Sequence, residues 1–305
     1  MPQVSLPDEV RAGCAWVAER ASFVRVEEGR IAAYAAGLGG VDAPAEGESP
    51  VDGDPETRAA FAICMNAINF GSGWWPTVRK RPGHSGYATM AAGVEERFAE
   101  AGPWSAEELV AMSPAAVAAG LGQDPAHPLM AQFAAALRDV GERLRTGHGG
   151  RFLGVVEGAD SIPALAGVLA GWDAFADASE YEGREIPFFK RAQLAAADLR
   201  RAGVADLPGT ERLTAFADNL VPHVLRVDGI LRLDPGLTAR IEAEELLAHG
   251  SPEEVELRAG AVQAIELLST ACDLTPAEID SALWSRGRGR RYKSLPRPRS
   301  RNTAY

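Results

Sequence analysis

Alanine-rich stretches with helical periodicity cover most of this 305-residue chain, and they restrict its fold more than any other feature. Alanine, leucine, glutamine and arginine are strong helix formers, whereas the alternation of apolar and polar residues that marks a half-buried strand is scarce. The sequence therefore predicts a mainly α fold, a single compact helical body with a few short strands. The predicted helices cover residues 7–20, 27–37, 55–68, 87–101, 105–119, 127–146, 161–177, 187–202, 209–227, 236–248, 251–271 and 275–284.

Short strands are predicted at 22–26, 68–75 and 152–156, where β-branched and aromatic residues cluster. The acidic stretch 43–55 is rich in proline and glycine, so we expect a surface loop there. No repeat of 20–50 residues is present, which argues against a solenoid. We expect one domain over residues 1–305, and a subdivision near residue 150 remains open.

Charge and composition exclude several classes of protein. A net charge of −11 argues against a general affinity for nucleic acid or anionic membranes. The basic run 286–301 is an exception, which we interpret as a solvated tail. We expect no secretory or transmembrane segment, because no suitable apolar run is present. The three cysteines lie far apart, and the five histidines form no metal-binding pair. We expect a reduced, cytoplasmic protein without a metal site.

The segment 186–199 carries the strongest chemical signal. Pro187 fits the first turn of a helix, where its missing N–H is no loss. Arg191 and Asp198 are seven positions apart, so they return to nearly the same face of that helix, which Leu194 makes apolar. Burying a carboxylate on an apolar face costs several kcal/mol of folding free energy unless the carboxylate has a partner or takes part in a reaction. Asp198 is therefore the first catalytic candidate, with a purely structural buried ion pair as the alternative.

Four other segments place polar and aromatic residues in apolar surroundings. Residues 69–76 hold three aromatic rings. These rings either pack a loop against the core or stack on a flat heterocycle, with Asn69 forming hydrogen bonds to the edge of that heterocycle. Asp218 interrupts the helix predicted at 209–227, where Pro222 should kink or end the helix. The remaining segments are 279–284, with an acid and a tryptophan one helical turn apart, and the chain end 299–305.

Two turns in the second half of the chain are similar to those of helix-hairpin-helix DNA glycosylases. In those enzymes a Leu-Pro-Gly turn precedes a catalytic aspartate in a Val-Asp pair. Here Leu207-Pro208-Gly209 precedes Val227-Asp228-Gly229. The spacing is approximate, and the second glycine of the hairpin is missing.

Together the segments resemble the queuosine salvage family, the queuosine 5′-phosphate N-glycosylases. The resembling segments follow the order of the family over nearly the whole chain. They are Asn69-Phe70 with the following Trp, Gly86-Tyr87, Phe188-Phe189-Lys190-Arg191-Ala192-Gln193 through Asp198, Leu213-Thr214 to Pro222, Ile279-Asp280 with Leu283-Trp284, and the Arg-x-Arg-x-Thr-Ala-Tyr end.

The resemblance implies a fold similar to helix-hairpin-helix DNA glycosylases and hydrolysis of the N-glycosidic bond of queuosine 5′-monophosphate. The reaction releases queuine for tRNA modification and requires no metal, cofactor or covalent intermediate. We expect a small-molecule substrate, no stable nucleic-acid partner, no membrane and a monomer.

The expected site follows from this reaction. Asp198 would stabilise an oxocarbenium-like ribosyl cation and orient or deprotonate water. A second carboxylate, Asp280 with Asp218 as substitute, would accept the N–H donors of the 7-deazaguanine base. Aromatic rings would stack on the base, and cations, including the terminal arginines, would hold the 5′-phosphate. The expected substrate-binding residues are Asn69, Phe70, Trp75, Phe189, Lys190, Arg191, Asp218, His223, Asp280, Trp284 and Tyr305.

Two other functions stay open. The chain could be a nucleic-acid-binding protein that keeps a glycosylase-like scaffold without chemistry, using its basic tail and aromatic loop. It could also be a DNA glycosylase that uses Asp228.

Overall fold

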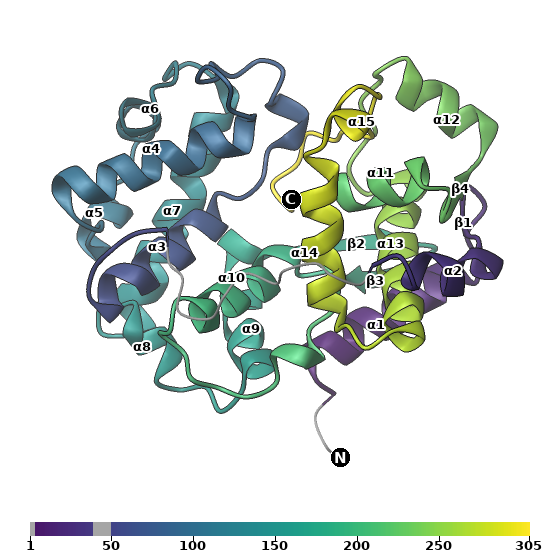
Figure 1. Ribbon diagram of the computed structural model, residues 1–305. Helices are drawn as coiled ribbons and strands as arrows, with labels where there is room; N and C mark the ends of the chain where they lie inside the picture. The colour runs from purple at the N-terminus through teal and green to yellow at the C-terminus, as the bar shows by residue number, and fades with distance from the viewer. Residues whose placement is uncertain (1–3, 39–49) are drawn as a thin grey trace.

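The computed structural model describes residues 4–38 and 50–305 and is mainly helical, which confirms the fold class predicted from the sequence (Figure 1). The longer helices are α1 (Leu6–Ala18), α3 (Pro55–Ala67), α4 (Gly86–Ala101), α6 (Pro114–Leu121), α7 (Pro128–Gly147), α9 (Ile162–Ala170), α10 (Lys190–Arg201), α11 (Leu220–Val227), α12 (Pro235–Glu242), α13 (Pro252–Ala271) and α14 (Pro276–Gly287). The short ones are α2 (Ile31–Ala35), α5 (Ala106–Val110), α8 (Leu153–Val156), α15 (Arg290–Lys293) and the 3-10 turns η1 (Glu28–Arg30), η2 (Ser72–Trp74), η3 (Asp173–Phe175) and η4 (Thr210–Arg212).

Buried apolar side chains form two clusters, which define two lobes. The first lobe contains α3 to α10, and the second contains α1, α2 and α11 to α15. Figure 1 shows the lobes side by side, with α14 and the end of the chain between them. Phe189, just before α10, packs against both clusters. The boundary between the lobes therefore lies at the start of α10 and along α14.

Four short strands form two small antiparallel sheets. Strand β1 (Val24–Val26) pairs with β4 (Leu231–Leu233), so the predicted strand at 22–26 is confirmed. Strand β2 (Ala178–Tyr181) pairs with β3 (Arg184–Pro187) through a two-residue turn. Both turn residues, Glu182 and Gly183, have positive φ (48° and 76°), as a type I′ hairpin requires.

This hairpin changes the start of the central helix. Pro187 ends β3 and does not begin a helix, so that prediction was wrong. Phe189 then turns the chain with φ 48° and ψ 40°, and α10 begins at Lys190. A left-handed backbone at a phenylalanine is uncommon and costs free energy, so the contacts around this residue must hold it there.

The helix predicted at 27–37 consists of η1 followed by α2, and two longer predicted helices are also divided in the structure. The one at 105–119 splits into α5 and α6, because Ser113 caps a new helix that begins at Pro114. The one at 209–227 splits into η4 and α11, so Asp218 does not interrupt a helix. Its Oδ1 instead accepts hydrogen bonds from the N–H groups of Leu220 and Val221 at the start of α11. Pro222 lies in this first turn, where its missing backbone N–H is no loss, so it neither kinks nor ends the helix.

Three further predictions fail in detail. The helix predicted at 161–177 ends at Ala170 and is followed by η3 and then β2. The strands predicted at 68–75 and 152–156 are wrong, because these segments contain η2 and α8. Residues 43–49 of the expected surface loop lie outside the described residues.

A buried ion pair joins the two lobes. Arg258 on α13 donates to both carboxylate oxygens of Asp177, at 2.8 and 2.7 Å, and their side chains are 1% and 0% exposed. Asp177 also receives the backbone N–H of Lys190, at 2.9 Å. Its backbone carbonyl accepts the N–H groups of Phe188 and Phe189. One aspartate therefore fixes both the turn before α10 and the approach of α13.

We expect Asp177→Ala to lower the free energy of unfolding by about 3–5 kcal/mol, because the buried Arg258 then loses its counter-charge. Urea unfolding followed by circular dichroism measures this loss. The control is Glu157→Ala, which removes an exposed ion pair with Arg151 and should leave the midpoint nearly unchanged. Equal losses in the two variants would contradict the role of the pair.

No helix among the described residues has the length and apolar character needed to cross a membrane.

Candidate active site

Asp198 lies in the second half of α10, and both of its oxygens have partners. Oδ2 accepts from Nδ2 of Asn66 at 2.8 Å, and Oδ1 pairs with the guanidinium of Arg201. Burial raises the pKa of Asp198, while Arg201 and Asn66 oppose this shift. The side chain is still 28% exposed, so a substrate can approach it.

Lys190 is the first residue of α10 and is 5% exposed. Its Nζ donates to the backbone oxygen of Asn69 at 3.2 Å. Burial lowers the pKa of Lys190 to about 8, against the opposing fields of Asp218 and Asp280. The lysine is therefore a buried cation with two carboxylates nearby and spare N–H donors.

Asp280 lies on α14, and its charge interacts with that of this lysine. It is 4% exposed, and its Oδ1 accepts from the N–H of Phe216 at 3.0 Å. Burial and the neighbouring Asp218 raise the pKa of Asp280 well above the ordinary carboxyl range, and Lys190 opposes them. Trp284 lies one turn further along α14. An N–H donor of a bound ring would favour the charged form of this carboxylate.

Tyr87 connects the surroundings of Asp198 to α14. Its ring packs edge-on against Trp284, with ring centroids 5.9 Å apart. Burial raises the pKa of Tyr87 to about 12, and the field of Asp198 adds to the shift. Helix α4, which carries this tyrosine and belongs to the first lobe, therefore contacts α14 in the second lobe.

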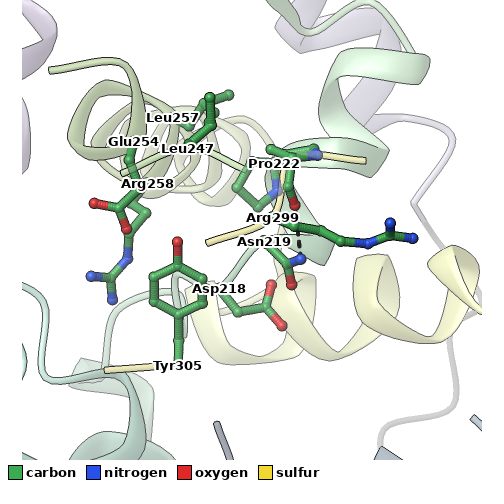
Figure 2. Close-up of a pocket in the computed structure, with 10 residues that line it drawn as sticks. Asp218, Asn219, Pro222, Leu247, Glu254, Leu257, Arg258, Arg299 and Tyr305 are labelled. Atoms are coloured by element: carbon green, nitrogen blue, oxygen red, sulfur yellow. Dashed lines mark hydrogen bonds between the residues drawn. The ribbon is translucent and has the colours of Figure 1, made fainter. Parts of the chain in front are cut away.

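Tyr305 and Asp218 lie beside each other at a small hollow. Figure 2 shows the Tyr305 hydroxyl directed towards Glu254 and Arg258, with Asp218 next to the ring. The Arg258 guanidinium lies 4.5 Å from the centre of this ring. The backbone oxygen of Tyr305 accepts from Gly71, so the chain end holds the aromatic loop in place.

Three of the expected substrate-binding residues have other partners. Phe70 is 1% exposed and packs against Phe133. Arg191 forms no ion pair with Asp198. Its three guanidinium nitrogens donate to backbone oxygens, one each of Ala67, Thr303 and Ala304.

His223 is also engaged within the protein. Its Nε2 lies 3.0 Å from the backbone oxygen of Tyr292, which can only accept, so Nε2 carries the proton. Burial lowers the pKa of His223 to about 4, so the ring is neutral at pH 7. A neutral ring is a poor partner for a phosphate.

Two further aromatic residues expected to bind the substrate are partly buried. Trp75 is partly buried and covers Gly86, where an added Cβ would lie 2.6 Å from the indole ring. Phe189 is partly buried between the two clusters. Both rings keep some exposed surface for a ligand. Asn69 is partly buried, and its Nδ2 donates to Oδ1 of Asn66 at 3.3 Å.

A groove of about 440 Å³ opens next to this site. Its walls come from the last turn of α10, from η4 and from the first turns of α14. Arg201, which pairs with Asp198, lines it together with Phe216, whose N–H holds Asp280. The groove therefore borders the residues that hold both carboxylates.

Sequence reasoning missed the partners of the site carboxylates. Asn66 and Arg201 hold Asp198, and Phe216 holds Asp280 through its backbone. Arg201 follows Asp198 by three positions on the same helix, a spacing that predicts contact. Asn66 and Phe216 carry no comparable signal, because their contacts come from distant segments.

Within residues 4–38 and 50–305, no group of three or more His, Cys, Asp or Glu side chains is arranged to hold a metal ion.

Asp228, the alternative catalytic residue, lies at the centre of a separate polar cluster. Its carboxylate accepts hydrogen bonds from the hydroxyls of Tyr34 and Tyr292 and pairs with Arg286 and Arg291. The side chain is 6% exposed. These contacts join α2, α11, α14 and α15, so we expect Asp228 to stabilise the packing of these helices.

We expect Asp228→Asn to lower the free energy of unfolding by about 2 kcal/mol, because two arginines lose their counter-charge and charged hydrogen bonds become neutral. Thermal and urea unfolding measure the loss. Asp206→Asn is the control, since that carboxylate is fully exposed and the variant should unfold like the wild type. An unchanged Asp228→Asn midpoint would be inconsistent with the structural role.

Comparisons with known proteins agree with the resemblance seen in the sequence. The model of the family described as queuosine salvage protein matches residues 49–305. The chain is 32% identical over 270 residues to a queuosine 5′-phosphate N-glycosylase/hydrolase of Sphaerobacter thermophilus, with 82% of each chain covered. It is 26% identical to the protein of that name from Dictyostelium discoideum, covering 82% of this chain and 79% of the relative. A third, from Mus musculus, is 29% identical over 58% of this chain and 59% of its own length. The chain therefore belongs to the queuosine salvage protein family.

Proposed function

We propose that this protein hydrolyses the N-glycosidic bond of queuosine 5′-phosphate and releases queuine. The relatives carry the name of this activity, and the lobe boundary holds the groups that the reaction needs. The observation that carries the proposal is the accessible Asp198 carboxylate, which Asn66 and Arg201 hold in place. Asp198 lies on the same helix as the buried Lys190.

Asp198 is our candidate for the carboxylate that faces the sugar. Departure of the base leaves positive charge on C1′ and the ring oxygen, which a nearby anion stabilises. The same carboxylate can orient water for attack on C1′ and accept its proton. Because Arg201 and Asn66 hold the carboxylate in the free enzyme, little reorganisation is required when the charge develops.

Asp280 is our candidate for the reader of the base, with Asp218 as the substitute. Queuine lacks the N7 that a purine offers for protonation, so its departure depends on hydrogen bonds to the base edge. A buried carboxylate with one free oxygen suits the N–H donors of that edge. Trp75, Phe189, Trp284 and Tyr305 supply rings for stacking.

Lys190 is our candidate for the phosphate ligand. Arg191 and His223 have other partners, whereas Lys190 uses one N–H donor for Asn69 and keeps others. A terminal arginine such as Arg301, which is exposed, can add a second positive charge.

We further propose that residues 1–305 form one queuosine-salvage unit, active as a monomer on a free nucleotide without a metal or cofactor. Helices α1 and α2 precede the segment of family similarity, yet both pack against α13 in the second lobe. We also propose that the fold is similar to helix-hairpin-helix DNA glycosylases. The Leu-Pro-Gly turn supports this, because Gly209 has φ 97° and the Pro208 carbonyl receives the N–H of Ile162.

The first test is release of queuine from queuosine 5′-phosphate, followed by chromatography, with and without a metal chelator. Wild-type protein should release the base in both. Asp198→Asn should reduce kcat by at least about 10³-fold, since the anion that stabilises the ribosyl cation is lost. A folded Asp198→Asn variant with full activity would remove Asp198 from the mechanism.

The second test concerns the phosphate. Lys190 is charged below its pKa of about 8 and neutral above it, so kcat/KM for the nucleotide should fall as the pH rises through about 8. The nucleoside lacks the phosphate and should not show this fall. In Lys190→Met the preference for nucleotide over nucleoside should decrease, and the fall near pH 8 should disappear. Identical pH profiles for both substrates in the wild type would exclude Lys190 as the phosphate ligand.

A further inference from the structure

We propose that Asn66 is a positioning residue for this reaction, one that holds the Asp198 carboxylate in a single orientation and in its ionised form. The inference rests on the proposed function, in which Asp198 faces the sugar. Asn66 itself does not touch the reacting atoms in this proposal.

The contacts of Asn66 use every polar atom of its side chain. The residue lies near the end of α3 and is 2% exposed. Its Nδ2 donates to the backbone oxygen of Ala62 at 3.0 Å and to Oδ2 of Asp198 at 2.8 Å. Its Oδ1 accepts from Nδ2 of Asn69 at 3.3 Å.

These partners determine which way the amide points. A backbone carbonyl can only accept, so the atom facing Ala62 must be the nitrogen. The same nitrogen therefore presents its second N–H to Asp198, and Oδ2 of Asp198 must act as the acceptor. Oδ1 of Asp198 faces the Arg201 cation. Protonation of either Asp198 oxygen would weaken a contact with a donor, so Asn66 and Arg201 favour the carboxylate and oppose the effect of burial.

The network also sets the position of the other site residues. Asn69, which donates to Asn66, begins the aromatic loop at 69–76. The backbone oxygen of Asn69 accepts from Nζ of Lys190 at 3.2 Å. Asn66 thus connects the end of α3, the aromatic loop and two side chains of α10 in one continuous set of hydrogen bonds.

The experiment compares three variants with the wild type. Asn66→Ala removes the donor. Asn66→Asp keeps the shape but places a second carboxyl group against Asp198. Gln123→Ala is the matched control, because Gln123 is also a buried amide with three hydrogen bonds, but its partners are Arg79 and Leu121.

The readouts are kcat, KM and the acid limb of the kcat–pH profile. In Asn66→Ala we expect kcat to fall about 10- to 100-fold with little change in KM, and the acid limb to move up by about one pH unit, since a donor to the charged form is lost. Asn66→Asp should move the limb further, because two neighbouring carboxyl groups share a proton. Gln123→Ala should unfold at a lower temperature and keep the wild-type profile.

A merely structural role for Asn66 predicts a different result. In that case Asn66→Ala and Gln123→Ala would lose stability alike, and the acid limb would stay in place in both. That result would overturn the inference.

A measurement on the wild-type protein covers the case in which the Asn66 variants do not fold. Carboxyl ¹³C NMR gives the pKa of Asp198, with its signal identified by comparison with Asp198→Asn. An ionised Asp198 at pH 7 supports the inference, and a protonated one overturns it.

The two levels of the proposal fail separately. Full activity in Asp198→Asn would defeat the mechanism under the proposed function. An inactive Asp198→Asn, combined with Asn66 variants that keep the wild-type pH profile, would defeat only the role of Asn66.

Discussion

The buried pair of Asp177 and Arg258 is the contact on which the rest of the site depends. Asp177 follows η3 in the first lobe, and Arg258 belongs to α13 in the second, so their two short hydrogen bonds fix the distance between the lobes. The same aspartate receives the N–H of Lys190 at the start of α10, where a negative charge also stabilises the helix. The Arg258 guanidinium lies between the rings of Phe188 and Tyr305. One desolvated charge pair thus fixes the helix that carries the lysine and the end of the chain.

Helical periodicity was sufficient to predict the fold class and most of the long helices, because burial of one face repeats along each of them. It failed where short-range geometry decides the structure. The hairpin at 178–187 was missed because Glu182-Gly183 is a less common pair for a type I′ turn than Asn-Gly. The division of 209–227 was missed because Asp218, one position before the N-cap Asn219, accepts two N–H groups at the start of α11, and the apolar pattern alone does not reveal this contact.

The sequence suggested which residues belong to the candidate site, but it did not predict which residues contact them. Asp198, Lys190 and Asp280 do lie near the lobe boundary, yet their chemical states depend on Asn66, Arg201, Phe216 and Asp218, which come from other segments. The same limit explains Arg191 and His223. Both residues belong to segments that resemble the family, but only the fold shows that backbone carbonyls take up their donors. Tertiary hydrogen bonds of this kind leave no trace in local spacing.

Because Lys190 and Asp198 share one helix, α10 fixes the spacing between the proposed phosphate ligand and the carboxylate proposed to face the sugar. Eight residues of α-helix set an axial separation of about 12 Å between these positions, and no hinge lies between them. Asp280 and Trp284 stand on α14 in the other lobe. A small rotation of one lobe against the other would therefore move Asp280 and Trp284 relative to α10, while the spacing between Lys190 and Asp198 stayed constant. Under the proposed mechanism, the base and the ribose phosphate are bound by different lobes, so substitutions on α14 should alter base selectivity without altering how the sugar phosphate is bound.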